Sequence, residues 1–78
     1  MMQITIYTKS NCPNCVSAKA LLKSKGLEYE EKNAEDPVVW LELLGKAPDV
    51  RQMPQIFIDG QRVGGLAGLK DALIQLGL

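Results

Sequence analysis

Polar and apolar residues alternate from Gln3 to Thr8 (QITIYT), and this period of two predicts a β-strand. A helix is expected next, with Cys12 at its N-cap and Pro13 in its first turn, where the missing N–H of proline costs nothing. Gly26 suits the position just after this helix. The apolar side expected for the helix consists of Val16, Ala18, Ala20, Leu21 and Leu22.

The middle of the chain is more polar. Residues 27–33 predict a second strand, and the four charged residues among them favour a place at a sheet edge. Asp36 and Pro37 form a second pair of N-cap and first-turn residues. The helix that they begin is expected to run to about Leu44 and to end at Gly45.

Two short strands and a helix are predicted for the last third of the chain. Residues 55–58 (QIFI) predict a buried strand, which a tight Asp-Gly turn joins to a return strand over residues 61–63. A final helix is expected after the Gly-Gly pair at 64–65. Its apolar stripe consists of Leu66, Leu69, Leu73 and Leu76.

The predicted order of elements is therefore β-α-β-α-β-β-α. A right-handed crossover in the first βαβ unit makes its two strands parallel, and the later hairpin adds an antiparallel pair. We expect a fold of the α/β class, with a four-stranded mixed sheet flanked by helices on both faces. With 78 residues the chain has room for one domain, spanning residues 1–78.

Charge and hydropathy exclude several kinds of partner. Nine basic and nine acidic residues cancel, which argues against nucleic-acid binding as the main role. No apolar run reaches the ~18–20 residues of a membrane span, and the N-terminal residues lack the pattern of a signal peptide. We expect a cytoplasmic protein that binds neither nucleic acid nor membrane.

The sulfur chemistry is concentrated in one motif, CPNC at residues 12–15. The chain has only these two cysteines and no histidine. A structural zinc site needs four such ligands, and a c-type haem motif needs a histidine where Val16 stands. A disulfide within one helical turn closes too short a loop to add much stability. The motif therefore favours a redox-active pair, and no metal is expected.

Cys12 is predicted to be the reactive sulfur, because unpaired N–H groups and the positive end of the helix dipole meet at an N-cap. Such sites lower a cysteine pKa from about 8.5 to roughly 3.5–7.5. The charge pattern supports this prediction: residues 1–27 contain four lysines and no acid, whereas residues 28–42 contain six acids and one lysine. Lys9 is the lysine expected to face the thiolate or an anionic ligand.

Three segments resemble the glutaredoxins of the thioredoxin-fold superfamily: YTKSNCPNC (7–15), QMPQIFIDGQRVGG (52–65) and the final helix. The resemblance covers nearly all of the chain and implies a thioredoxin-like fold. It also implies a glutathione-dependent thiol–disulfide oxidoreductase that reduces protein disulfides and glutathione mixed disulfides. By family analogy, ribonucleotide reductase is among the implied clients, and we expect a monomer.

The resemblance assigns roles to individual residues. It makes Cys12 the nucleophile, Cys15 the resolving thiol and Pro54 a cis-proline that faces both sulfurs. Glutathione, as co-substrate, would lie along the backbone of Met53 as a short extra strand. The residues implied in glutathione binding are Lys9, Asn14, Gln52, Met53, Pro54, Gly65, Leu66 and Ala67.

The chain departs from the family pattern in three respects. Asn14 stands where an aromatic residue is usual, and Met53 replaces the common valine. Ala67 and Gly68 stand where the family usually has acidic residues, so the amino group of glutathione would lack a charge partner. This departure motivates a second hypothesis, a glutaredoxin-like redoxin that thioredoxin reductase reduces and that donates electrons to ribonucleotide reductase.

A third hypothesis is an iron–sulfur cluster carrier, in which a dimer would hold a cluster through Cys12 of each chain and two glutathione molecules. Pro13 argues against it, because family members that bind clusters mostly lack a proline at this position.

Overall fold

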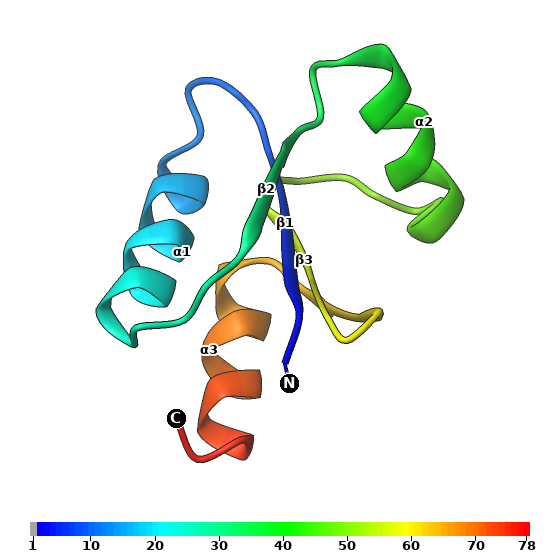
Figure 1. The fold of residues 1–78 in the computed structure, drawn as a ribbon. Coiled ribbons are helices and arrows are strands. Elements are labelled where there is room, and N and C mark those ends of the chain that lie inside the picture. Colours follow the sequence, from blue (N-terminus) through cyan, green and yellow to red (C-terminus); the bar gives the residue numbers. More distant parts are fainter. Residues whose placement is uncertain (1) are drawn as a thin grey trace.

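A four-stranded mixed sheet and three helices form the computed structural model of this chain, which describes residues 2–78 (Figure 1). The elements are β1 (Ile4–Thr8), α1 (Pro13–Ser24), β2 (Glu30–Asn33), α2 (Pro37–Lys46), β3 (Gln55–Ile58), β4 (Gln61–Gly64) and α3 (Leu66–Gln75). Their order confirms the predicted β-α-β-α-β-β-α sequence.

The strands lie in the order β2-β1-β3-β4, with β1 parallel to β2 and antiparallel to β3, and with β3 antiparallel to β4. The α/β fold expected from the sequence is confirmed, and so is the edge position of the charged strand β2. Because of these directions, β1, β2 and β4 all terminate at the same end of the sheet, which is the end where β3 begins. Three segments therefore lie close together at that end of the sheet: the loop before Cys12, the segment before Gln55 and the start of α3.

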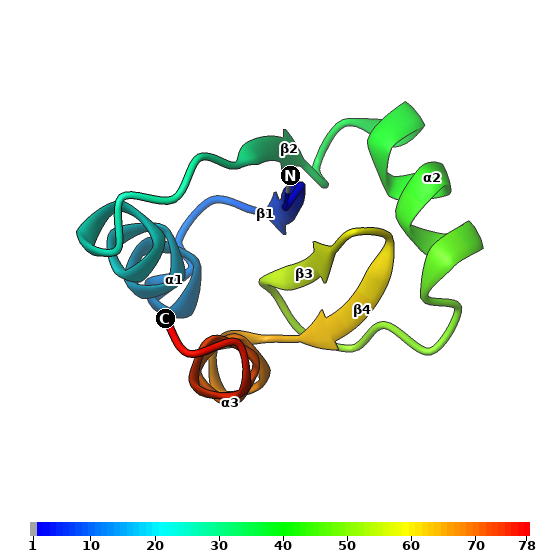
Figure 2. The same ribbon diagram turned by 60° about the horizontal axis from the view of Figure 1, so that its bottom comes forward.

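The helices cover both faces of the sheet, because alternate strand residues point to opposite sides. Figure 2 shows α1 and α3 on one side and α2 on the other. Ile4, Ile6, Ile56 and Ile58 form one buried cluster with four side chains of α1 and α3, namely Ala18, Leu22, Leu69 and Leu73. The opposite face buries Tyr7, Ala34, Leu43, Ala47 and Phe57 under α2. The longest helix has 12 residues, and none within residues 2–78 is long and apolar enough to cross a bilayer.

The apolar side predicted for α1 was partly wrong. The residues that α1 buries are Cys15, Ala18 and Leu22, at spacings of three and four along one stripe. Val16 lies off this stripe and is 64% exposed, and Ala20 is exposed as well. The cap prediction is confirmed, because Cys12 is the N-cap, Pro13 follows it, and Gly26 has a φ of +67° just after the helix.

Three predicted boundaries also differ from the structure. The helix α2 continues through Gly45 to Lys46, and the N–H of buried Ala47 donates to the carbonyl of Leu43 at 2.7 Å. The strand β2 begins only at Glu30, three residues later than expected. Leu76 caps the end of α3 and is 52% exposed, so it does not belong to the buried stripe.

Candidate active site

Cys12 and Cys15 form a disulfide at the start of α1, with their Cα atoms 5.2 Å apart. Cys12 has the extended backbone of an N-cap residue, with a φ of −122° and a ψ of 95°. Its carbonyl oxygen accepts the N–H groups of Cys15 at 3.1 Å and Val16 at 3.2 Å. Its Sγ atom accepts the N–H of Cys15 at 3.1 Å, so a backbone donor of the first turn points at this sulfur.

The two cysteine residues differ in the fraction of their surface that is exposed to solvent. Cys12 is 8% exposed and Cys15 only 2%. An open depression of about 540 Å³ lies beside the disulfide. It is lined by Lys9, Asn11, Cys12, Pro13, Cys15, Val16 and Lys19. Lys9 therefore shares a surface with the sulfurs, as its place three residues before Cys12 predicts.

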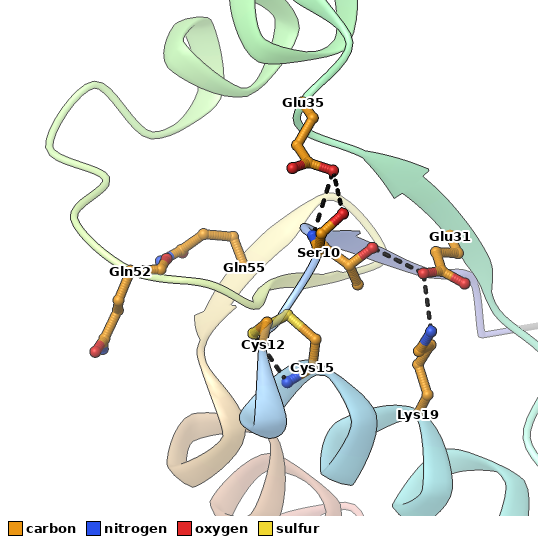
Figure 3. The surroundings of a disulfide bond; sticks show 9 residues. Ser10, Cys12, Cys15, Lys19, Glu31, Glu35, Gln52 and Gln55 are labelled. Atoms are coloured by element: carbon orange, nitrogen blue, oxygen red, sulfur yellow. Dashed lines mark hydrogen bonds and ion pairs between the residues drawn. A yellow bond between two sulfur atoms is a disulfide. The ribbon is translucent and has the colours of Figure 1, made fainter.

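Glu31, at the edge strand, connects the end of β1 to α1 (Figure 3). Its Oε2 atom accepts the hydroxyl of Thr8 at 2.7 Å and the ammonium group of Lys19 at 3.0 Å. The bond from Thr8, followed by the one from Lys19, holds the pKa of the Glu31 carboxyl below its ordinary value. The side chains of Lys19 and Glu31 are 29% and 40% exposed, so this ion pair contributes only about 0–1 kcal/mol.

A second carboxylate holds the loop between β1 and Cys12. The Oε1 atom of Glu35 accepts the backbone N–H of Ser10 at 3.3 Å and its hydroxyl at 2.7 Å (Figure 3). Next to Ser10, Asn11 adopts the left-handed region with a φ of 55°, which asparagine tolerates better than most residues. Sequence reasoning missed both carboxylates, and the only available signal was the run of acids in residues 28–36 opposite the lysines of α1.

The segment before β3 lies at the same end of the sheet as the disulfide. The peptide bond between Met53 and Pro54 is cis, and Pro54 is buried. Gln55 is 3% exposed, and its Nε2 atom donates to the carbonyl of Gln52 at 2.9 Å. Its Oε1 atom accepts the Nε–H of Arg62 at 3.2 Å, so the segment is tied to β4.

The start of α3 adjoins this segment. A Cβ atom built on Gly65 would lie 3.4 Å from the carbonyl oxygen of Pro54 and 3.9 Å from Nε2 of Gln52. The structure thus brings together Gln52, Pro54 and Gly65, as the resemblance implies. In the view of Figure 3, Gln52 and Gln55 lie on the opposite side of the disulfide from Lys19 and Glu31.

The remaining predicted residues are more dispersed. Met53 is partly buried against the core under α2, and Leu66 is partly buried against the core under α1 and α3. Asn14 and Ala67 are both exposed.

The first turn of α3 packs too closely on β4 for a side chain at position 68. A Cβ atom built on Gly68 would overlap the carbonyl oxygen of Val63 and lie 2.9 Å from its carbonyl carbon. Both opposing atoms are backbone, so a small rotamer change cannot relieve the contact. Position 68 must therefore be a glycine in this packing, whereas the neighbouring Ala67 faces solvent.

A thioredoxin-like fold with a CxxC disulfide at the start of its first helix defines a thiol–disulfide oxidoreductase. The chain belongs to the glutaredoxin family: residues 4–63 match the family profile named Glutaredoxin. It is 43% identical to glutaredoxin 3 of Escherichia coli K12 over 65 residues, covering 83% of this chain and 78% of that protein.

Solved structures share the fold. Glutaredoxin 1 of Francisella tularensis, complexed with cacodylate, superposes with a TM-score of 0.80 at 26% identity, covering 97% of this chain and 96% of that one. NrdH-redoxin of Escherichia coli, a glutaredoxin-like protein with a thioredoxin-like activity profile, has a TM-score of 0.75 at 27% identity, covering 95% and 93%.

Proposed function

We propose that this protein reduces protein disulfides and glutathione mixed disulfides, and that glutathione restores its dithiol. The observation that carries the proposal is the asymmetry of the cysteine pair. Cys12 is the more exposed residue of the pair, at 8% against 2% for Cys15, and its Sγ atom accepts the backbone N–H of Cys15. This arrangement suits an attacking thiolate followed by an internal resolving thiol.

The exchange proceeds in two steps. The Cys12 thiolate attacks one sulfur of a client disulfide, forms a mixed disulfide, and expels the other client sulfur as a thiolate. The Cys15 thiolate then attacks Sγ of Cys12, which forms the Cys12–Cys15 disulfide and releases the second client thiol. Two electrons pass to the client, and the oxidised product corresponds to the disulfide in this structure.

Two glutathione molecules reverse this oxidation. The first glutathione thiolate attacks Sγ of Cys12, forms a mixed disulfide and frees Cys15. The second attacks the glutathione sulfur, so that oxidised glutathione leaves and the Cys12 thiolate returns. Lys9 beside Cys12, and the backbone N–H groups of Leu66 and Ala67 beyond the Gln52–Pro54–Gly65 contact, are proposed to hold the two carboxylates of glutathione.

A second candidate keeps the chemistry but takes electrons from thioredoxin reductase. Two observations favour it: Ala67 supplies no charge for the amino group of glutathione, and Gly68 has no room for an acidic side chain. The likeness in fold to NrdH-redoxin, whose activity profile is thioredoxin-like, agrees with this candidate.

The electron source is tested by measuring steady-state turnover of a disulfide client with either of two donor systems. One system contains glutathione, glutathione reductase and NADPH, and the other contains thioredoxin reductase and NADPH. We expect faster turnover with glutathione. Turnover with thioredoxin reductase alone would replace the glutathione proposal with the second candidate.

We propose that the protein works as a monomer in the cytosol, where reduced glutathione is the abundant thiol. Ribonucleotide reductase is a proposed client by family analogy alone.

A further inference from the structure

The depression beside the disulfide extends along α1 to Val16 and Lys19. It shares Lys9 with the proposed glutathione contacts but does not include Gln52, which lies on the opposite side of the disulfide from Lys19 (Figure 3). Val16 lies in its wall and is 64% exposed, directly after the buried resolving cysteine. A branched apolar side chain this exposed beside a reactive sulfur gains nothing for the fold, because α1 buries other residues.

Both charged residues that line the depression are lysines, and the Glu31 carboxylate is bound to one of them. Lys9 and Lys19 line it, and no acidic residue does. The ammonium group of Lys19 is paired with Glu31 at 3.0 Å, but both side chains remain substantially exposed. Glu31 also accepts the hydroxyl of Thr8 at 2.7 Å, so it keeps a partner if Lys19 turns toward the depression. Lys19 can therefore exchange one carboxylate for another at little cost.

We propose that this depression is the docking surface for the client segment next to the attacked disulfide, and that it favours segments with an apolar side chain and a carboxylate close to the cysteine. Val16 contacts the apolar side chain, and Lys19 pairs with the carboxylate. The proposal deepens the proposed function, because it rests on Cys12 as the attacking sulfur, but it does not depend on which donor reduces the enzyme.

The lysines of the depression should make the protein select clients by the charge of the segment next to the attacked disulfide. A segment docked along α1 places its cysteine sulfur at Cys12, where the depression contains the disulfide. Attack then forms the bond between Cys12 and the client sulfur, and the second client sulfur leaves as a thiolate. An acidic segment is attracted to a surface with two lysines, whereas a basic segment is repelled.

The test compares two disulfide-bonded peptides that differ only in a glutamate or a glutamine two residues from the cysteine. The second-order rate constant for reduction by the dithiol form is measured for each peptide at low salt. For the unmodified protein we expect the glutamate peptide to react about threefold faster, as an exposed ion pair allows. A change in Cys12 reactivity alters both rates equally, and the intrinsic reactivity of each peptide is the same for every variant, so a change of the ratio between variants reports docking.

Two pairs of variants make the test specific. Lys19→Gln should lower the ratio toward one, with the remaining preference due to Lys9, whereas Lys70→Gln, at an exposed lysine of α3 outside the depression, should preserve it. Val16→Ser should slow both peptides about two- to threefold, as the loss of a partly buried apolar contact predicts, and Val38→Ser on α2, where valine is 75% exposed, should slow neither.

Two kinds of result would contradict the proposal, and they can be told apart. Equal rates for the two peptides in the unmodified protein, or a ratio that Lys19→Gln leaves unchanged, would overturn the docking surface while leaving the proposed exchange chemistry intact. Failure of the unmodified protein to reduce either peptide would contradict the proposed function itself, and the docking surface with it.

Discussion

Replacing Gly68 with alanine is the substitution for which helix propensity and packing predict opposite results. Gly68 lies in the first turn of α3, and glycine inside a helix is about 0.5–1 kcal/mol less favourable than alanine. Propensity alone therefore predicts that Gly68→Ala stabilises the fold. Packing predicts the reverse, because the new methyl group would overlap the carbonyl oxygen of Val63.

The relative size of the two effects decides whether Gly68→Ala raises or lowers the free energy of unfolding. The opposing atoms belong to the backbone of β4, so α3 must move away from the sheet, and overpacking of this kind costs typically 1–3 kcal/mol or more. The clash outweighs the gain, and we expect a net loss of about 1–2 kcal/mol. In a domain of this size each kcal/mol lowers the melting temperature by about 4–8 °C.

Gly45→Ala is the matched control. Gly45 is also in a helix, α2, but a Cβ atom built there meets nothing within 4 Å. This variant should gain about 0.4–1 kcal/mol. Urea unfolding of both variants, followed by circular dichroism, measures the two changes in free energy. A Gly68→Ala variant as stable as Gly45→Ala would refute the close packing of α3 on β4.

Four further predictions concern the cysteines, the glutathione site and pH. Alkylation of the single-serine variants across pH should label Cys12 in Cys15→Ser at lower pH than Cys15 in Cys12→Ser, because only Cys12 is at the N-cap; faster acidic labelling of Cys15 would reverse the assignment. Cys15→Ser should still reduce glutathione mixed disulfides but lose most activity on protein disulfides, and equal loss of both would contradict a resolving role. Ala67→Asp should lower the glutathione concentration for half-maximal turnover about two- to fivefold at low salt, because an exposed acid gains about 0.5–1 kcal/mol with an ammonium group; an unchanged dependence would place glutathione elsewhere. Since Thr8 and Lys19 lower the pKa of Glu31, its stabilising effect is complete above the ordinary value of 4.5 and is lost as the pH falls through the lower folded-state value. Glu31→Gln should therefore weaken the pH dependence of the free energy of unfolding below pH 4.5, measured by urea unfolding. An unchanged pH dependence would contradict the pairing of Glu31 with Thr8 and Lys19.

Local sequence patterns predicted much of this fold because they depend on neighbouring residues. The alternation at residues 3–8 and the Cys12-Pro13 pair each specify an element or its start within a few positions, and the structure contains both. The redox pair could be predicted for the same reason, since an N-cap and the residue three positions later meet within one helical turn.

Features that depend on contacts between distant segments could not be predicted in this way. The exposure of Val16 depends on where α3 and the sheet meet α1, and Gly45 lies within α2 instead of ending it. The carboxylate of Glu31 reaches Thr8 across 23 positions of sequence, and the contact of Gly68 with Val63 depends on the angle at which α3 leaves β4. No periodicity in the chain encodes these distances.

The site of a trapped glutathione adduct tests most directly whether Cys12 is the exchanging sulfur. The reduced forms of Cys15→Ser and Cys12→Ser would each be incubated with oxidised glutathione, quenched with acid, digested and analysed by mass spectrometry. We predict rapid formation of a mixed disulfide on Cys12 in Cys15→Ser and little reaction of the buried Cys15 in Cys12→Ser. A comparable or faster adduct on Cys15 would contradict the account.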